Sequence, residues 1–399
     1  MWKLLKQTPL KEAFLTKKLQ ERIDQKAFRQ LRLPDGKTDF CSNDYLGIVR
    51  NSLIEKVSGH YRPGASQFGS PPHHGSTGSR LLAGNYPLIE ETERSLAAFH
   101  NAPAGLILNS GYDANLGLLS CVPQRGDTVL YDYLSHASIR DGIRLSFARS
   151  YSFGHNDLND LEKKLLAAEG AIAEREAVAS DGTDATKGTV FVVTESVFSM
   201  DGDQAPLTEL AALCNRYGAR LIVDEAHATG VIGAKGEGLV QELGLQDACF
   251  ARIHTFGKAV GCHGAIILGS DTLRDYLINF CRAFIYTTAL PETSIEAIRA
   301  AYAIFPGMDK ERDRLRQLIA RFRQAPMVFE RLNSQTPIQV VIVPGNEAVK
   351  ELARQLQDKG LDVRPILYPT VPKGSERLRI VLHAFNTEVQ TDTLIRMLQ

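Results

Sequence analysis

The chain of 399 residues lacks an excess of charge of either sign, because its 46 lysines and arginines balance its 46 aspartates and glutamates. A balanced chain has no net field that would attract nucleic acid or an acidic membrane, so we expect neither as a partner. The hydrophobic content of 44% and the charged content of 23% are typical of a globular protein. The composition therefore favours a protein that acts on small molecules.

Cysteine is sparse, and the six cysteines form no CxxC pair and no spacing typical of a metal site. We interpret them as buried, reduced side chains in a reducing compartment. No hydrophobic run is long enough to span a bilayer, and the charged residues 1–6 do not resemble a signal peptide. A cytoplasmic protein without a metal site is expected.

The sequence also lacks GxGxxG and GxxxxGK[ST], the two glycine-rich patterns that usually bind dinucleotides and nucleotides. What it has is an alternation of short apolar runs with longer helical patterns between about residues 45 and 285. Such alternation predicts an α/β fold with a largely parallel sheet and helices on both faces. The clearest predicted strands are residues 105–108, 128–131, 191–194, 221–224, 253–255 and 265–268.

A chain of this length is expected to form two domains. Residues 1–44 carry a helical pattern that predicts an N-terminal arm, and residues 45–289 form the predicted large domain. After Pro291 the pattern changes to charged helices with two further strand candidates, residues 338–343 and 377–382. Residues 290–399 are therefore predicted to be a smaller α+β domain.

Lys258 lies in a turn of small residues, 255–261, directly after a predicted strand. Such a lysine, taken alone, is most simply an exposed side chain. A lysine amine in a tight, partly desolvated turn can also lose its proton and attack a carbonyl. Upstream, the predicted strand 221–224 ends on Asp224, and His227 follows three residues later. A lysine for an aldehyde and a carboxylate for a ring nitrogen are the two requirements of pyridoxal phosphate chemistry.

Other polar residues follow the ends of other predicted strands, where ligands sit in an open parallel sheet. Gly111 and Tyr112 open a helical stretch, which is either an ordinary strand-to-helix turn or a phosphate site at a helix N-terminus. His136 can stack on an aromatic cofactor ring, or it is simply a residue at a helix start. Ser199 and His227 can reach the ring hydroxyl, and Thr255 can hydrogen-bond the phosphate.

Six short segments, in order, resemble the α-oxoamine synthases, a family of pyridoxal-phosphate enzymes. Their combination is highly specific, and the match runs from about residue 40 to the C-terminus. The segments are residues 42–47, 135–138, 194–202, 223–230, 255–258 and 369–372.

The resemblance implies the aspartate-aminotransferase-like fold of type I and a homodimer with each active site at the subunit interface. It implies pyridoxal 5′-phosphate as the cofactor and Lys258 as its Schiff-base lysine. Asp224 then becomes the pyridinium partner, His136 the stacking residue, and His227 with Ser199 the ligands of the ring oxygen. Gly111, Tyr112 and Thr255 are carried over for the phosphate, and Thr287 or Thr288 for the phosphate of the partner subunit. Arg379 with Asn43 is carried over for the amino-acid carboxylate.

The implied reaction is the decarboxylative condensation of a small amino acid with an acyl thioester. The segments 42–47 and 369–372 are most similar to the members that join alanine to a pimeloyl thioester on coenzyme A or an acyl carrier protein, in biotin synthesis. Thr370 lies in the second segment, and Arg29 aligns with a donor-contacting arginine of the arm, for which Arg32 competes. Glycine with an acetyl thioester and serine with a long acyl thioester stay open, as does a non-catalytic protein of this fold.

Two features bear on the acyl donor. Many relatives have arginine and proline before Pro-Thr-Val-Pro, whereas this chain has Leu367 and Tyr368, with Arg364 three places earlier. The segment 71–80 resembles the family's glycine-rich loop near the acyl site. Its pair His73 and His74 lacks a third ligand, so it predicts a loop and not a metal site.

Overall fold

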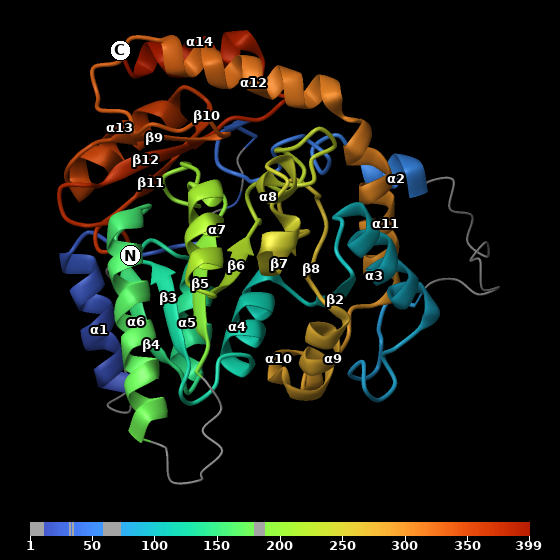
Figure 1. Ribbon diagram of the computed structural model, residues 1–399. Helices are drawn as coiled ribbons and strands as arrows, with labels where there is room; N and C mark the ends of the chain where they lie inside the picture. Colours follow the sequence, from blue (N-terminus) through green and yellow to red (C-terminus); the bar gives the residue numbers. More distant parts are fainter. Residues whose placement is uncertain (1–11, 32, 34–35, 59–72, 179–187) are drawn as a thin grey trace. The chain divides into compact units, whose positions relative to one another are not determined.

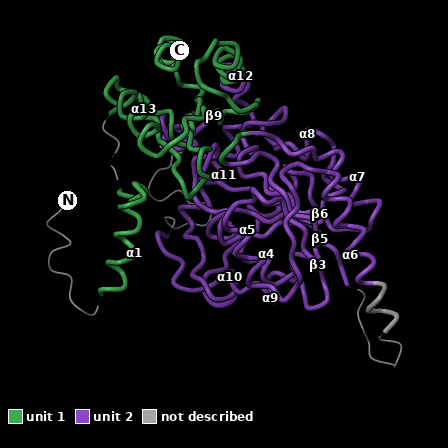
Figure 2. Tube along the Cα trace, turned by 90° about the vertical axis from the view of Figure 1, so that its left-hand side faces the viewer, with its two compact units in different colours: residues 1–42, 200–202, 315–399 green, residues 43–199, 203–314 purple. Residues whose placement is uncertain are grey.

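The computed structural model describes residues 12–31, 33, 36–58, 73–178 and 188–399. Residues 1–6 and Arg32, on which predictions were made, lie outside this part of the chain. The chain forms two compact units that interleave along the sequence (Figure 2). One consists of residues 43–199 and 203–314, and the other of residues 1–42, 200–202 and 315–399. The three-part division at residues 44 and 289 stays a prediction.

The larger unit is built on a seven-stranded sheet of order β2-β8-β7-β6-β5-β3-β4 (Figure 1). Only β8 runs antiparallel to its neighbours. The predicted parallel sheet is confirmed, and all six predicted strands are present. The strands are β2 Ala104–Leu108, β3 Thr128–Asp132, β4 Arg149–Phe153, β5 Val190–Glu195, β6 Arg220–Asp224, β7 Cys249–Thr255 and β8 Ala265–Gly269.

Sequence reasoning missed β4, because this edge strand has four exposed residues and a single buried one, Phe153. The central strands are apolar throughout because both faces of the sheet are covered. On β5, Val190 and Val192 belong to one core, while Phe191 and Val193 belong to the other.

Helices cover the two faces separately. α6 Leu158–Val178, α7 Leu207–Arg216 and α8 Leu239–Glu242 pack on one face, and α4 Gly111–Cys121, α5 Ala137–Leu145, α9 Asp271–Phe280 and α10 Arg282–Ile285 pack on the other. The unit also contains α2 Leu53–Ser58, α3 Pro87–Phe99, α11 Glu292–Ile304 and the short 3-10 helices η2 Gln246–Ala248 and η3 Phe305–Gly307. Among the described helices, none has both the length and the apolar character needed to cross a membrane.

The smaller unit contains a three-stranded antiparallel sheet of order β11-β12-β9. The predicted strands at 338–343 and 377–382 are confirmed as β9 and β12. The elements are α1 Ala13–Asp24, β1 Thr38–Asp39, β9 Ile338–Ile342, α13 Asn346–Asp358, β10 Leu361–Asp362, β11 Arg364–Ile366, β12 Arg377–Val381 and α14 Glu388–Met397. β1 pairs with β10 in parallel, and α12 Asp309–Gln324 crosses the boundary between the units.

In the larger unit, the turn after β6 packs against the turn after β7. The Gly230 amide donates to the Gly236 carbonyl at 2.7 Å, and both glycines have positive φ. A Cβ on Gly230 would lie 2.8 Å from the Ala259 Cβ, closer than carbon atoms pack. The turn that carries Lys258 therefore packs directly against the backbone at Gly230, where only glycine leaves enough room.

We expect Gly236→Ala to destabilise the protein by about 2–4 kcal/mol, since the new Cβ combines a positive φ with a clash. Its Cβ would lie 2.7 Å from the Gly230 carbonyl oxygen. The matched control is Gly244→Ala, where φ is also positive but no atom lies within 4 Å, and about 1 kcal/mol is expected. Denaturant unfolding measures both. Equal losses would contradict the packing argument.

Candidate active site

Side chains of chemical interest follow four parallel strands of the larger unit at their carboxyl ends. β3 is followed by His136, β5 by Ser199, β6 by His227 and β7 by Lys258. In a parallel sheet these ends meet at one edge, which is where ligands bind in α/β folds. This edge of the sheet is therefore the expected ligand-binding site.

A chain of hydrogen bonds begins at the Lys258 amine. The Lys258 Nζ lies 2.7 Å from His227 Nε2, and His227 Nδ1 lies 2.6 Å from the Tyr45 hydroxyl. The Tyr45 hydroxyl also lies 3.1 Å from Asn43 Oδ1. Tyr45 is fully buried, and His227 is 5% exposed. The predicted residues Lys258, His227 and Asn43 are thus linked through a tyrosine that sequence reasoning left without a role.

The acceptor groups determine which atom donates in each of these hydrogen bonds. The amide oxygen of Asn43 can only accept, so the single proton of the Tyr45 hydroxyl goes to it. His227 Nδ1 must then donate to Tyr45, which leaves the lone pair on Nε2 to accept from Lys258. The lysine amine is held by a neutral imidazole of one defined tautomer.

Asp224 is buried at the end of β6, with 5% of the residue exposed. Its Oδ2 accepts from Asn115 Nδ2 at 2.7 Å and its Oδ1 from the Ala226 amide at 2.9 Å. Both partners donate, which stabilises the ionised carboxylate. The same Asn115 Nδ2 donates to the Ser138 hydroxyl at 3.1 Å. Asn115, on α4, therefore fixes the carboxylate and was also missed from the sequence.

His136 caps the N-terminus of α5 and belongs to the same network. Its Nδ1 lies 2.7 Å from the Ser138 hydroxyl, and its backbone amide donates to Glu195 Oε1 at 2.6 Å. Burial lowers the pKa of His136, partly offset by the charge of Asp224. A neutral imidazole at this position suits contact with the face of an aromatic ring.

Glu195 was part of a recognised segment but received no role from the sequence. It lies opposite Asp224 in the register of β5 and β6 and is 3% exposed. Burial and the neighbouring Asp224 charge raise the pKa of Glu195 to about 8. The sequence shows only that a carboxylate ends each of two apolar runs, and the register that places Glu195 opposite Asp224 comes from the structure.

The predicted phosphate side lies at the start of α4. Ser110 caps this helix by accepting from the Asp113 amide, and Gly111 is the first helical residue. A Cβ at Gly111 would lie 3.3 Å from the Thr255 hydroxyl oxygen, so glycine leaves that hydroxyl uncovered. The structure therefore brings Gly111 and Thr255 together beside a helix N-terminus, which favours an anion. Tyr112 points its hydroxyl to Asp141 and is half exposed.

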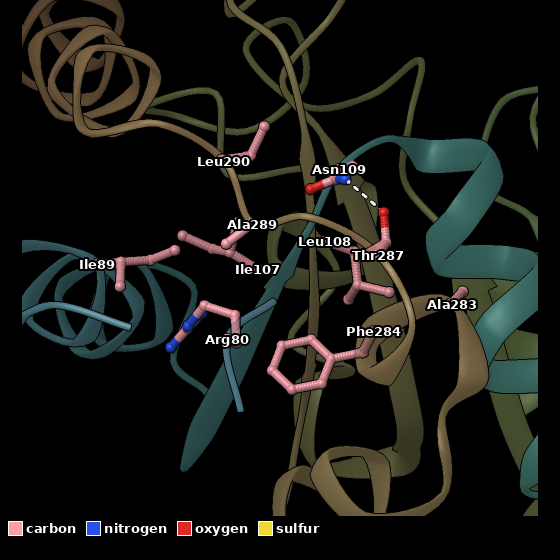
Figure 3. A pocket seen from close by; sticks show the side chains of 10 residues that line it. All are labelled: Arg80, Ile89, Ile107, Leu108, Asn109, Ala283, Phe284, Thr287, Ala289 and Leu290. Atoms are coloured by element: carbon pink, nitrogen blue, oxygen red, sulfur yellow. Dashed lines mark hydrogen bonds between the residues drawn. The ribbon is translucent and has the colours of Figure 1, made fainter. Parts of the chain in front are cut away.

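Thr287 and Thr288 lie against Asn109, the residue after β2. The Asn109 amide donates to the Thr287 hydroxyl at 3.1 Å and to the Thr288 carbonyl at 2.9 Å. Figure 3 shows Asn109 and Thr287 in a small pocket with Arg80 and other, mostly apolar, side chains. Arg80 is committed to Glu93 at 2.7 Å in a buried ion pair.

Arg379, Thr370 and Arg29, the residues predicted for substrates, lie in the smaller unit. Arg379 is half-buried on β12, between β11 and β9. Arg29 NH2 donates to the Thr370 hydroxyl at 3.1 Å, which joins the N-terminal segment to the segment 369–372. Arg364 pairs with Asp362 at 2.6 Å.

The residues at the sheet edge fit pyridoxal phosphate. The buried carboxylate of Asp224 suits a protonated pyridine nitrogen, and a lysine amine lies on the same edge. The amide oxygen of Asn115 is buried without a partner, which leaves an acceptor beside the Asp224 carboxylate. The Gly111 amide at the start of α4 supplies a donor for a phosphate, and it lies beside the Thr255 hydroxyl, which donates to the Gly264 carbonyl at 3.3 Å. Among the described residues no three histidines, cysteines or acids are grouped to hold a metal ion.

The chain belongs to the aminotransferase class I and II family, whose profile matches residues 35–398. The predicted fold of type I is thereby confirmed, and pyridoxal phosphate is the cofactor. Serine palmitoyltransferase from S. paucimobilis, in a structure with bound PLP, has a TM-score of 0.79 and 27% identity, with 98% of each chain covered.

Within this family the chain resembles the α-oxoamine synthases, as the sequence predicted. It is 42% identical to the 8-amino-7-oxononanoate synthase of Emericella nidulans, over 96% of this chain and 93% of the relative. The solved 8-amino-7-oxononanoate synthase from Francisella tularensis has a TM-score of 0.69 and 27% identity, covering 92% of this chain and 97% of its own.

We expect Tyr45→Phe to weaken pyridoxal phosphate binding about tenfold, because His227 Nδ1 loses its buried acceptor. The apparent Kd follows from titration of the apoenzyme with the cofactor. The control is Tyr217→Phe, which also removes one hydroxyl, bonded to Glu162 at 2.9 Å away from the sheet edge. Wild-type affinity in Tyr45→Phe would show that the tyrosine does not hold His227 in place.

Proposed function

We propose that this protein condenses L-alanine with a pimeloyl thioester, with loss of carbon dioxide, to form 8-amino-7-oxononanoate in biotin synthesis. The observation that carries the proposal is the lysine amine beside a buried carboxylate at one sheet edge, in a chain about 40% identical to synthases of that name over nearly its whole length. The enzyme is then a PLP-dependent acyltransferase.

The roles of the residues at the sheet edge follow from their chemistry. When bound, the cofactor supplies an electrophilic carbon for amines and a ring that accepts electrons. Asp224 keeps the ring nitrogen protonated, and His136 packs on the ring face. Ser199 and His227 would hold the ring oxygen, His227 by accepting from the ring hydroxyl at Nε2 when the Lys258 amine does not occupy that lone pair. Gly111, Tyr112 and Thr255 would hold the phosphate.

Lys258 acts as the anchor of the cofactor and then as the base. With the cofactor and substrate bound, the free Lys258 amine would be placed to take a proton from the substrate Cα. His227 accepts a hydrogen bond from this amine at 2.7 Å and so orients it. The fixed tautomer of His227, set by Tyr45 and Asn43, keeps this acceptor in place.

The amino-acid substrate is recognised by its carboxylate. Arg379 presents a planar guanidinium that can bind a carboxylate with two hydrogen bonds, and Asn43 adds a second contact. Arg29 and Thr370, which contact each other at 3.1 Å, are proposed to bind the acyl thioester.

The acyl donor depends on the segment in which this chain departs from its relatives. Arg364, three residues before Leu367, has its guanidinium paired with Asp362 at 2.6 Å. The Tyr368 backbone is held by Asn346, whose Oδ1 accepts from the Tyr368 amide at 2.9 Å. The same Asn346 donates to the Gln25 carbonyl at 2.8 Å, so the segment and the arm share one anchor.

A second candidate is a serine palmitoyltransferase-like reaction of serine with a long acyl thioester. It is favoured by the similarity to serine palmitoyltransferase structures, with TM-scores up to 0.81 among those compared. Glycine with an acetyl thioester is a third pair within the same chemistry. A homodimer with Thr287 and Thr288 at the partner subunit's phosphate, an acyl carrier protein as the thioester carrier, and a cytoplasmic location complete the proposal.

A matrix of alanine, glycine and serine against pimeloyl, acetyl and palmitoyl thioesters tests the substrates. We expect alanine with the pimeloyl thioester to give the highest kcat/KM, measured as release of free thiol and carbon dioxide. Each thioester is offered on coenzyme A and on acyl carrier protein. A higher value for serine with the palmitoyl thioester would replace the first proposal with the second.

Arg379→Ala is expected to raise the KM for alanine about 10- to 100-fold, since a charge-assisted carboxylate contact is lost. Arg379→Lys keeps the charge without the planar pair of donors and should fall between. The control is Arg354→Ala, an exposed arginine of α13 in the same unit. An unchanged KM in Arg379→Ala would assign the carboxylate to another residue.

A further inference from the structure

His155 joins two turns of the larger unit that both lead into the active site. It follows β4 and was not recognised from the sequence. Its Nδ1 lies 3.0 Å from Asp132 Oδ1, and its Nε2 lies 2.7 Å from Asp203 Oδ2. Asp132 ends β3, and Asp203 closes the turn after β5. The ring therefore bridges the segments that follow two neighbouring strands, β3 and β5.

Each aspartate is held by a hydrogen bond within its own turn, Asp132 in the turn after β3 and Asp203 in the turn after β5. Asp132 Oδ1 accepts from the Leu134 amide at 2.8 Å, two residues before His136. The Asp203 carbonyl accepts from the Phe198 amide at 3.0 Å, directly before Ser199. Movement of either aspartate would therefore move one of the residues proposed to contact the cofactor.

The neighbours of the ring leave it one protonation state. Both ring nitrogens face carboxylate oxygens, which only accept, so both nitrogens must donate and the imidazole is a cation. Asn156 supports the arrangement, since its amide donates to Asp132 at 2.9 Å and its side chain to Asp203 at 2.9 Å. Asp203 Oδ1 has no hydrogen-bond partner and is buried, so its charge is balanced through Oδ2 alone.

Other groups around the ring do not oppose this charge. The Phe198 ring meets His155 edge to face at 4.4 Å between centroids, and the Tyr133 ring does so at 6.3 Å. Asp160, from α6, accepts from the Gly154 amide beside His155 and is paired with Lys164. Burial lowers the pKa of His155, but the hydrogen bonds to Asp132 and Asp203 outweigh it and raise the pKa to about 10.

We propose that His155 is a positioning residue, an imidazolium that ties the turn carrying His136 to the turn carrying Ser199 through Asp132 and Asp203. The proposal rests on the cofactor roles proposed above for those two residues, but not on the identity of the substrates. The hydrogen bonds from His155 to Asp132 and Asp203 hold both turns in place while the imidazole is protonated. They are weakened when the imidazole is neutral, and the turns are then no longer held together by this ring.

The sign of the pH effect follows from the raised pKa. A group with a higher pKa in the folded state stabilises the fold fully below its unfolded pKa, about 6.5, and the contribution is lost as pH rises towards about 10. The contribution of His155 to the stability of the fold is therefore large near neutral pH and absent in strong alkali.

The test compares His155→Gln with a matched variant, His100→Gln. His100 is also buried and bonded at both nitrogens, to the Glu237 carbonyl and the Tyr302 hydroxyl, but burial lowers its pKa to about 3, so it is neutral. Apoenzyme of each protein is titrated with pyridoxal phosphate. The holoenzymes are unfolded in denaturant at about pH 7 and at about pH 10.5.

His155→Gln is expected to weaken cofactor binding at least about tenfold near pH 7, and its unfolding midpoint should approach that of the wild type at about pH 10.5. His100→Gln should keep the cofactor affinity within about twofold and show the same midpoint deficit at both pH values. Wild-type cofactor affinity in His155→Gln, or a midpoint deficit that does not shrink with pH, would overturn the proposal.

Asp203→Asn keeps the test decisive if His155→Gln does not fold, since it removes one charge and leaves a shape of the same size. In Asp203→Asn the stabilisation by protonated His155 should be lost at a lower pH than in the wild type. Pyridoxal phosphate binding should be weakened, as in His155→Gln. Where His155→Gln does fold, the effects of the two substitutions should not add in the double variant, because both remove the same interaction. Additive effects would show that the two residues act independently. Failure of alanine and pimeloyl thioester as substrates would leave these binding and unfolding results unchanged, so the two proposals fail separately.

Discussion

The buried carboxylate of Asp224 is the charge on which the rest of the site depends. Asn115 Nδ2 and the Ala226 amide both donate to it at the end of β6. A second carboxylate, Glu195, lies opposite it, and two such charges in a buried place favour a proton on one of them. Burial and the Asp224 charge raise the pKa of Glu195 to about 8, which favours the proton on Glu195, and Asp224 would be the carboxylate that pairs with the ring nitrogen of the cofactor.

The positions of the other groups follow from the sheet. The turns after β3, β5, β6 and β7 leave the same edge, so residues far apart in the sequence meet there. Hydrogen bonds between these turns then fix their relative positions, from Lys258 to His227 and from His136 to Glu195. A backbone of glycines beside Ala259 lets the lysine turn pack closely. The rigid part of the site is the sheet, and the specific part is its loops.

Much of this could be predicted from the sequence, because strands and motif residues are local features. The apolar runs ending on Asp224 and Thr255 predicted both strands and their functional ends. Tyr45 could not be predicted in the same way, since it meets His227 across 182 positions of the chain. Asn115, Glu195 and His155 were missed for the same reason, as each acts through a partner on another element. The acyl-donor segment stays the least predictable part, because Leu367 and Tyr368 depart from the pattern of the relatives.

The account requires that the cofactor be attached to Lys258 and to no other lysine. Reduction of the holoenzyme with borohydride, digestion and mass mapping of the peptides measures this directly. The peptide that contains Lys258 is predicted to carry the whole pyridoxyl mass. Attachment to a different lysine, or bound cofactor with no lysine modified, would contradict the assignment of this sheet edge as the active site.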